Sequence, residues 1–170
     1  NPEDTPDAPT YTEIEFEAGK PVAVDGKKMK LSEIVIALNK ISGDNGFGRL
    51  DLVEDRLVGL KSRECYEVPG ALTLITAHKA LEDICVEGDL LKTKIKLEQD
   101  WATAVYNGQW YSPLKNALDA FMADTQKFVT GTVRLKFFKG NCHVVGRKSP
   151  FSLYDYGLAT YDLDTTFDEK

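Results

Sequence analysis

The sequence predicts an α+β domain built on a small, mostly antiparallel or mixed sheet. Segments that alternate between polar and apolar residues lie toward both ends of the chain, and segments with helical spacing occupy the middle. The predicted order is strands, a helix, a mixed segment, three helices and a hairpin, which favours α+β over a parallel doubly wound fold. The strands are expected near residues 12–17, 21–25, 49–67, 131–138 and 142–147, and the helices near 32–42, 69–86, 88–106 and 112–129.

The N-terminal part is predicted as a linker followed by a strand hairpin. Three prolines in an acidic context indicate an extended linker over residues 1–10. Residues 12–17 alternate polar and apolar side chains, which places Ile14 and Phe16 on one face of a strand. A turn containing glycine then leads to the partner strand at 21–25.

The next segments are a helix and a region of mixed character. Apolar residues at helical spacing predict the helix over 32–42, with Ser32 as its N-cap. Residues 43–48 are rich in glycine and end this helix. In residues 49–67, charged side chains interleave with leucines and valines and fit neither period throughout, which indicates short strands and turns.

Three further helices are predicted from their start signals. Pro69 begins the helix over 69–86, and Gly88 separates it from the helix over 88–106. Ser112 is the expected N-cap of the helix over 112–129.

The last predicted element is a hairpin of basic strands over 131–138 and 142–147. Residues 125–154 hold six basic and no acidic side chains, whereas residues 1–19 hold six acidic and no basic ones. Two interpretations stay open: an anion-binding surface, or ion pairs between the basic strands and the acidic ends or another subunit.

Composition limits the functions open to the chain. Its 170 residues include 21 basic and 27 acidic side chains, so the formal net charge at pH 7 is −6. A chain of this length can bury a substantial core. The acidic balance argues against a nucleic-acid partner, and the longest aliphatic run, residues 34–38, is too short to span a membrane.

The cysteines and histidines predict neither a disulfide framework nor a metal site. Three cysteines lie at wide spacings with no CxxC pair, a usage typical of reduced thiols in a cytoplasmic protein. His78 and His143 are far apart, without a spaced cluster of carboxylates, so we expect no metal. His78 lies on an apolar helix face and is expected to be a packing residue.

The strongest candidate site lies within residues 48–67. Its carboxylates and cations could hold the charged groups of an amino-acid-like ligand, and Tyr66 could add a hydrogen bond. The alternative is a structural ion-pair network around a strand pair. A second candidate, residues 110–113 (Trp-Tyr-Ser-Pro), could stack on a planar ligand or pack across a subunit interface. Phosphate-loop and nucleophile-elbow motifs do not occur.

Several motifs resemble those of argininosuccinate synthase. The longest is GRLDLVEDRLVGLKSR at residues 48–63, followed by Tyr66–Glu67 and Pro69–Gly70. Further blocks occur in the family's order, among them Trp110–Pro113, Ala117–Phe121, Val133–Lys136, Lys139–Asn141 and Ser149–Pro150. The resemblance begins near residue 11, and we expect residues 11–170 to be the family's synthetase and multimerisation domain.

The resemblance implies a reaction and assigns its substrates to two domains. The family joins citrulline and aspartate with ATP, giving argininosuccinate, AMP and pyrophosphate in arginine biosynthesis. The ureido oxygen of citrulline attacks the α-phosphate, and the aspartate amine then displaces AMP. ATP with Mg belongs to an N-terminal nucleotide-binding domain, whose Ser-Gly-Gly-Leu-Asp-Thr-Ser loop does not occur in this chain. No cofactor is therefore expected on this part alone. Family members are homotetramers, so this domain is expected to supply subunit contacts and the citrulline side of the site.

The family's citrulline contacts fall on Glu54 and Tyr66 of the matching motif. A carboxylate suits the α-ammonium of citrulline, and a phenol can bond its carboxylate or ureido end. The resemblance assigns no catalytic residue here, because the task of this part is orientation. Arg49, Lys61 and Arg63 are expected as supporting or structural groups.

One departure from the family pattern and one alternative complete the expectations. Many members have glycine where this chain has Glu64, and a requirement for positive φ there would alter the local turn. Because the chain starts at Asn1 and lacks the nucleotide loop, we expect a fragment of a longer enzyme that is inactive alone. The alternative is a stand-alone, non-catalytic binding or assembly module on the same fold.

Overall fold

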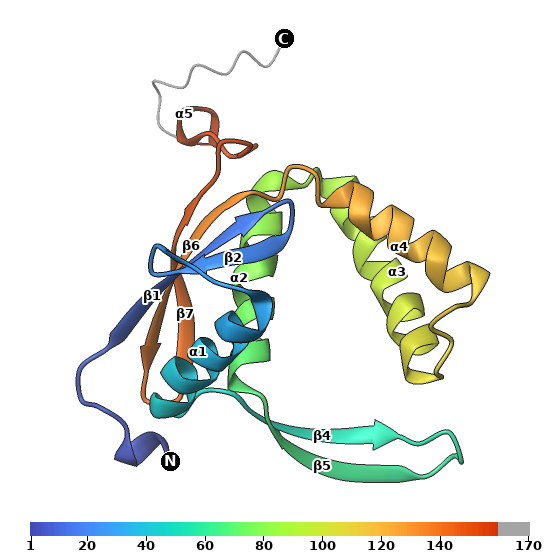
Figure 1. Ribbon diagram of the computed structural model, residues 1–170, viewed down its shortest axis with the longest axis horizontal. Helices are drawn as coiled ribbons and strands as arrows, with labels where there is room; N and C mark the ends of the chain where they lie inside the picture. The colour runs from blue at the N-terminus through green and yellow to red at the C-terminus, as the bar shows by residue number, and fades with distance from the viewer. Residues whose placement is uncertain (160–170) are drawn as a thin grey trace.

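The chain folds around a five-stranded antiparallel sheet that packs against two helices (Figure 1). The computed structural model describes residues 1–159. The strand order is β3-β2-β1-β6-β7. These strands are β1 (Thr10–Glu17), β2 (Lys20–Val24), β3 (Lys27–Lys28), β6 (Gly131–Phe138) and β7 (Asn141–Lys148). The predicted α+β class is confirmed.

The remaining elements are four long helices, a hairpin outside the main sheet and two short helical segments. The long helices are α1 (Leu31–Asp44), α2 (Pro69–Cys85), α3 (Gly88–Tyr106) and α4 (Pro113–Thr125). The hairpin outside the main sheet consists of β4 (Arg49–Asp55) and β5 (Lys61–Glu67). The short segments are η1 (Pro2–Asp4), a 3-10 turn, and α5 (Tyr156–Ala159).

The core lies between the sheet and helices α1 and α2. Ile14 and Phe16 of β1 are almost fully buried, as their alternation predicted. Alternate residues of β6, beginning at Val133, are buried as well, and Leu38 and Leu81 meet them from the two helices. Burial of one face of each strand accounts for the period-two pattern, since successive side chains of a strand point to opposite faces.

The β4–β5 hairpin is a separate two-stranded sheet that projects from the body (Figure 1). The sequence analysis grouped residues 49–67 with the strands of a single sheet. That grouping is wrong, because β4 and β5 pair with each other and not with the five-stranded sheet. The two ends of the hairpin meet where α1 and α2 pack side by side: the Val68 N–H donates to the Gly48 carbonyl at 2.8 Å. Gly48 has φ +117°, and a Cβ there would lie 2.3 Å from Pro69 Cα. The segment therefore leaves the body and returns at one point.

Helix α3 also projects, with α4 as its main packing partner (Figure 1). The predicted bounds of α2 and α3 are confirmed to within one residue. Ser112 caps α4 as predicted, because its Oγ accepts from the Lys115 N–H at 3.2 Å. Helix α4 ends at Thr125 rather than near 129.

The predicted N-cap of α1 is wrong by two residues. Lys30, not Ser32, precedes the helix, and its backbone N–H donates to Glu33 Oε2 at 2.8 Å. The Glu33 side chain thus accepts from the backbone N–H of the N-cap residue, as the third residue of a capping box does.

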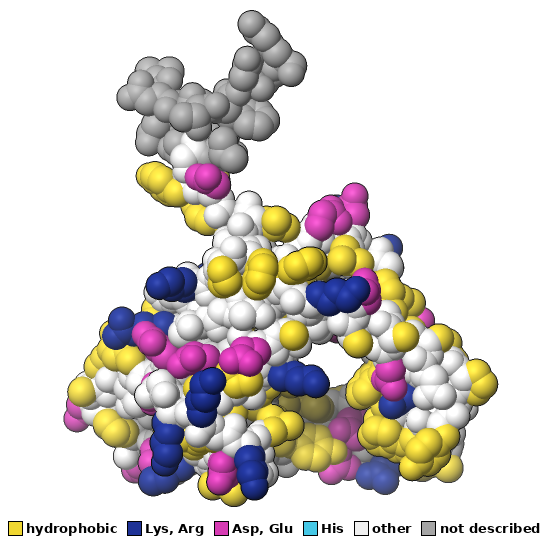
Figure 2. Space-filling model, turned by 45° about the horizontal axis from the view of Figure 1, so that its top comes forward, with side chains coloured by type: hydrophobic (Ala, Val, Ile, Leu, Met, Phe, Trp, Pro, Cys, Tyr) yellow, Lys and Arg dark blue, Asp and Glu magenta, His cyan; other side chains and the backbone are white. Residues whose placement is uncertain are grey.

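The basic hairpin lies beside acidic parts of the chain. Arg134 of β6 lies 3.9 Å from Glu13 of the neighbouring β1, and Lys139 lies 2.8 Å from Asp7. Lys139 Nζ also donates to the Thr5 carbonyl at 2.8 Å, which ties residues 1–10 to the β6–β7 turn. On the face drawn in Figure 2, basic and acidic side chains are interspersed. These contacts favour ion pairing over an anion-binding surface.

Candidate functional site

The β4–β5 hairpin presents two chemically different faces. Its register pairs Arg49 with Glu67 and Asp55 with Lys61. Because side chains alternate along each strand, the even-numbered residues share one face and the odd-numbered residues the other. The turn closes through backbone hydrogen bonds of Arg56, whose N–H donates to the Leu60 carbonyl at 2.9 Å.

Glu54 and Tyr66, the predicted citrulline contacts, lie together on the even face. Tyr66 Oη donates a hydrogen bond to Glu54 Oε1 at 2.8 Å, although the two residues are not direct partners in the register. This hydrogen bond raises the pKa of Tyr66 above its usual value, so the phenol keeps its proton. The pair therefore offers a carboxylate already oriented by a phenol.

The even face also carries Arg56 and Glu64, which sequence reasoning did not single out as site residues. Arg56 Nη2 donates to Glu64 Oε1 at 2.9 Å, and Arg56 Nε donates to Ser62 Oγ at 3.1 Å. The signal for this pair was the even spacing from Glu54 and Tyr66, which becomes informative once the segment is known to be a hairpin.

The three cations that were expected as supporting or structural groups, Arg49, Lys61 and Arg63, lie on the odd face. Each pairs with an acid of the same face: Arg49 Nε with Glu67 Oε1 at 2.9 Å, Arg63 Nε with Asp51 Oδ1 at 2.8 Å, and Lys61 with Asp55. The structure therefore brings Glu54 and Tyr66 together but does not bring these cations to them. The guanidinium of Arg63 holds the pKa of Asp51 below its usual value, so this pair stays charged.

A count of charges singles out Glu54. The hairpin holds five acids and four bases. Each base has an acid of the hairpin as its ion-pair partner, and Glu54 is the acid that remains. Within residues 1–159, no ion pair within 4.0 Å compensates Glu54, whose partner is the neutral phenol of Tyr66. The hairpin thus displays one uncompensated negative charge on a half-buried side chain.

Position 64 has regular strand geometry in spite of its departure from the family pattern. Glu64 pairs with Leu52 in the ladder and is not among the residues with positive φ. No special turn is therefore needed there, and Tyr66 points toward Glu54 with Glu64 in place.

The other sequence candidates lie on different elements. Trp110 and Tyr111 lie at the turn between α3 and α4, where Tyr111 is 95% exposed and Lys115 Nζ lies 5.5 Å from the Trp110 ring. His78 of α2 packs beside Phe16, with ring centroids 5.7 Å apart, as its position predicted.

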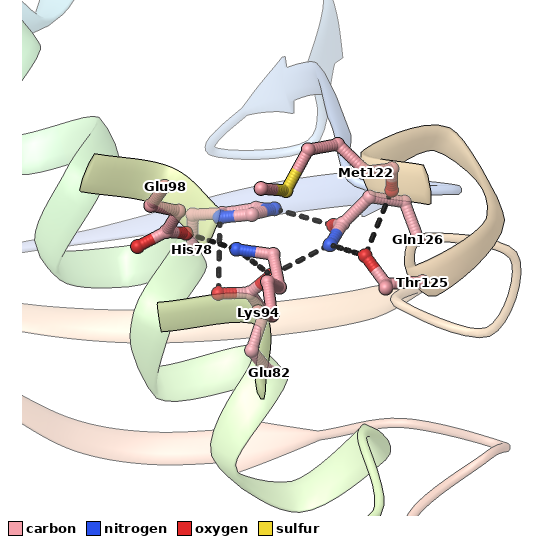
Figure 3. A network of polar contacts seen from close by, with 7 residues as sticks. All are labelled: His78, Glu82, Lys94, Glu98, Met122, Thr125 and Gln126. Atoms are coloured by element: carbon pink, nitrogen blue, oxygen red, sulfur yellow. Dashed lines mark hydrogen bonds and ion pairs between the residues drawn. The ribbon is translucent and has the colours of Figure 1, made fainter. Parts of the chain in front are cut away.

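His78 also belongs to a partly buried polar network that the sequence did not predict (Figure 3). His78 Nε2 lies 2.8 Å from Gln126 Oε1, and Gln126 Nε2 donates to Glu82 Oε1 at 2.6 Å. Lys94 of α3 reaches Glu82 at 3.0 Å and also pairs with Glu98. This network joins α2, α3 and the end of α4 beside a cavity of about 460 Å³.

Two structural findings bear on other site classes. Residues 1–159 contain no group of three or more His, Cys, Asp or Glu side chains arranged to hold a metal ion. None of the helices in the described part has the length and apolar character needed to cross a bilayer.

Comparison with known proteins identifies the family. A family model described as arginosuccinate synthase C-terminal domain matches residues 1–170. A protein named argininosuccinate synthase from Rubrobacter xylanophilus is 52% identical to this chain over 99% of its residues. Proteins of the same name from Bacillus pumilus and Bacillus subtilis are each 55% identical to it over 98% of its residues. The chain spans 41% of the length of each of these relatives. By this match, the chain belongs to the argininosuccinate synthase C-terminal domain family.

Proposed function

We propose that this chain is the C-terminal domain of an argininosuccinate synthase and that its β4–β5 hairpin forms the citrulline side of the active site. The reaction joins citrulline to aspartate with ATP and releases AMP and pyrophosphate. One observation carries the proposal: Glu54, beside Tyr66, is the uncompensated charge of the hairpin.

The chemistry of this pair suits an α-amino acid. Glu54 accepts hydrogen bonds from the α-ammonium, and the charge of the carboxylate makes them stronger than neutral ones. Tyr66 keeps its proton and can turn its hydroxyl to the ligand. Such contacts orient the ureido oxygen toward the α-phosphate, so the domain contributes by positioning rather than by proton transfer.

The proposal assigns the nucleotide to another part of the enzyme. The family model is a C-terminal domain and the chain covers 41% of its relatives, which supports a longer enzyme of which this chain is one part. We assign ATP with Mg and most of the aspartate site to the preceding part. ATP with Mg is then a substrate delivered to the hairpin face by that preceding domain.

The exposed apolar residues support a role in assembly as well. Leu57, Val58 and Leu60 at the tip of the hairpin are 64–77% exposed, although turns usually carry polar residues. Tyr111 and Trp110, at the end of the α3–α4 pair, are 95% and 50% exposed. Aromatic and aliphatic side chains of this kind are typical of interface centres. We propose that they contact other parts of a homotetramer.

The test is steady-state kinetics of the full-length enzyme with Glu54→Gln. Removing a charge-assisted hydrogen bond costs about 1.5–3 kcal/mol, so the KM for citrulline should rise about 10- to 150-fold. The KM values for ATP and aspartate should change little. Asp55→Asn is the matched control, because it removes the same charge from the adjacent residue on the opposite face. An unchanged citrulline KM in Glu54→Gln would remove Glu54 from the site.

The 170-residue chain itself provides a second test. Incubated with citrulline, aspartate and ATP, it should form no AMP, because the proposal places the nucleotide site elsewhere. Turnover at ordinary enzymatic rates, about 1 per second or faster, would contradict the assignment of roles.

A further inference from the structure

The ion pair between Arg56 and Glu64 lies directly beside Glu54 and Tyr66. Arg56 directly follows the last residue of β4, two residues beyond Glu54, and Glu64 lies two residues before Tyr66 on β5. The hydrogen bonds of Arg56 to Ser62 and Glu64 place its guanidinium on the face that carries the Glu54–Tyr66 contact. Glu54 is the main cause of the raised pKa of Tyr66, and the charges of Glu64 and Arg56 act on it in opposite directions. Both members of the ion pair are thus within electrostatic reach of the candidate site.

Arg56 determines how many negative charges this face presents. With the Arg56–Glu64 pair intact, the face carries the single charge of Glu54. Without Arg56, Glu64 would be a second bare carboxylate on a half-buried side chain. Ser62 also accepts from Arg56, and these two contacts hold the guanidinium over β5.

The number of negative charges affects ligands according to their own charge. An amino acid with a neutral side chain has a net charge of zero, because its ammonium and carboxylate cancel. An amino acid with a cationic side chain has a net charge of +1. A second carboxylate near the site attracts the cationic ligand and has little net effect on the neutral one.

We propose that the Arg56–Glu64 pair is a charge-selectivity device that favours amino acids with neutral side chains over those with cationic side chains. This inference rests on the proposed function, because it takes the Glu54–Tyr66 face as the amino-acid site. Arg56 acts here through Glu64, as a positioning and neutralising residue, and does not contact the substrate.

The test compares two ligands on the full-length enzyme. L-Arginine serves as the cationic probe, and its competitive inhibition constant is divided by the KM for citrulline. In Arg56→Gln this ratio should fall about fivefold, the effect of one screened charge several ångströms away. In Glu64→Gln, which leaves Arg56 unpaired, the ratio should rise by a similar factor. Opposite signs from the two variants cannot arise from damage to the hairpin alone.

Two further variants complete the design. The double variant Arg56→Gln/Glu64→Gln should return the ratio to within twofold of the wild-type value, because the face again carries one charge. Lys28→Gln is the charge control, since it removes a cation paired with Glu17 at 4.0 Å on the main sheet, and it should not change the ratio. Raising the salt concentration should shrink both shifts, because these side chains are partly exposed.

The outcomes separate this inference from the proposed function. The selectivity role is wrong if Arg56→Gln and Glu64→Gln leave the ratio within twofold of wild type or shift it in the same direction. The site itself stands in that case, provided that Glu54→Gln raises the citrulline KM. If Glu54→Gln leaves the citrulline KM unchanged, the site itself is wrong. If Arg56→Gln fails to fold, the rise in Glu64→Gln decides alone, and its absence overturns the inference.

Discussion

The buried ion pair between Lys94 and Glu82 should help to attach the α3–α4 pair to the body. The Lys94 and Glu82 side chains are 6% and 4% exposed, and Lys94 also pairs with Glu98 (Figure 3). Burial lowers the pKa of Lys94, but its hydrogen bonds to Glu98 and Glu82 outweigh this and leave the pKa above its usual value. Lys94 is therefore charged in the folded chain at neutral pH.

Lys94→Met removes the cation and leaves Glu82 buried. Breaking a buried pair by deleting one partner costs about 3–5 kcal/mol. We expect a cost near the lower end of this range, because Glu82 keeps one hydrogen bond, from Gln126 Nε2 at 2.6 Å. For a chain of this length, about 3 kcal/mol corresponds to a fall in Tm of roughly 6–12 °C.

Thermal unfolding of the 170-residue chain, followed by circular dichroism, measures this effect. Lys92→Met is the matched control, because Lys92 lies on the same helix and pairs with Asp89 while 73% exposed. Exposed pairs contribute about 0–1 kcal/mol, so this variant should melt within about 3 °C of wild type. Adding Glu82→Gln to Lys94→Met should recover part of the loss, since no buried charge is then left unpaired. If Lys94→Met melts as Lys92→Met does, the pair does not hold the helices.

Two further predictions concern the hairpin root and the response to acid. Gly48→Ala should lower stability by more than 2 kcal/mol in urea unfolding, because its Cβ would lie 2.3 Å from Pro69 Cα at a φ of +117°. Gly88→Ala, where nothing lies within 4 Å, should be neutral or stabilising. Hydrogen bonds from Lys115 and Trp101 lower the pKa of Asp119. The stabilisation from Asp119 is therefore present above about pH 4 and is lost as the pH falls through its folded-state pKa. Trp101 fluorescence should report the loss, and Asp119→Asn should remove that transition.

Periodicity predicted the parts of the fold in which one face is buried. In β1 and β6, alternate residues such as Ile14 and Val133 are buried, so the sequence pattern and the burial pattern are the same. The hairpin over 49–67 has no buried face, and Leu52 and Val53 are both exposed on opposite sides. Its separation from the main sheet depends on how α1 and α2 pack, which a local pattern does not contain.

The candidate site was predictable only in part for the same reason. Motif resemblance assigned Glu54 and Tyr66 by residue type, and hydrogen-bonding chemistry made the assignment reasonable. Spacing could show that Arg49 and Arg63 lie on the opposite face only once residues 49–55 and 61–67 are known to be regular strands, and the mixed pattern of this segment did not establish that. Lys94 was missed because a lysine on a helix is expected in solvent, whereas here it is buried by its partners on α2 and α3.

The ion pairs of the hairpin are better understood as neutralisation than as stabilisation. Two-stranded hairpins are marginal in water. Each exposed ion pair adds only about 0–1 kcal/mol. Stability alone therefore does not explain why this projecting hairpin carries nine charged residues, eight of them in four ion pairs. They do leave a single charge, that of Glu54, on a half-buried side chain beside Tyr66. Under the proposed function, the ammonium of the ligand meets one carboxylate, Glu54, on a face whose other charges are paired. On that proposal, the paired charges of the hairpin present Glu54 alone.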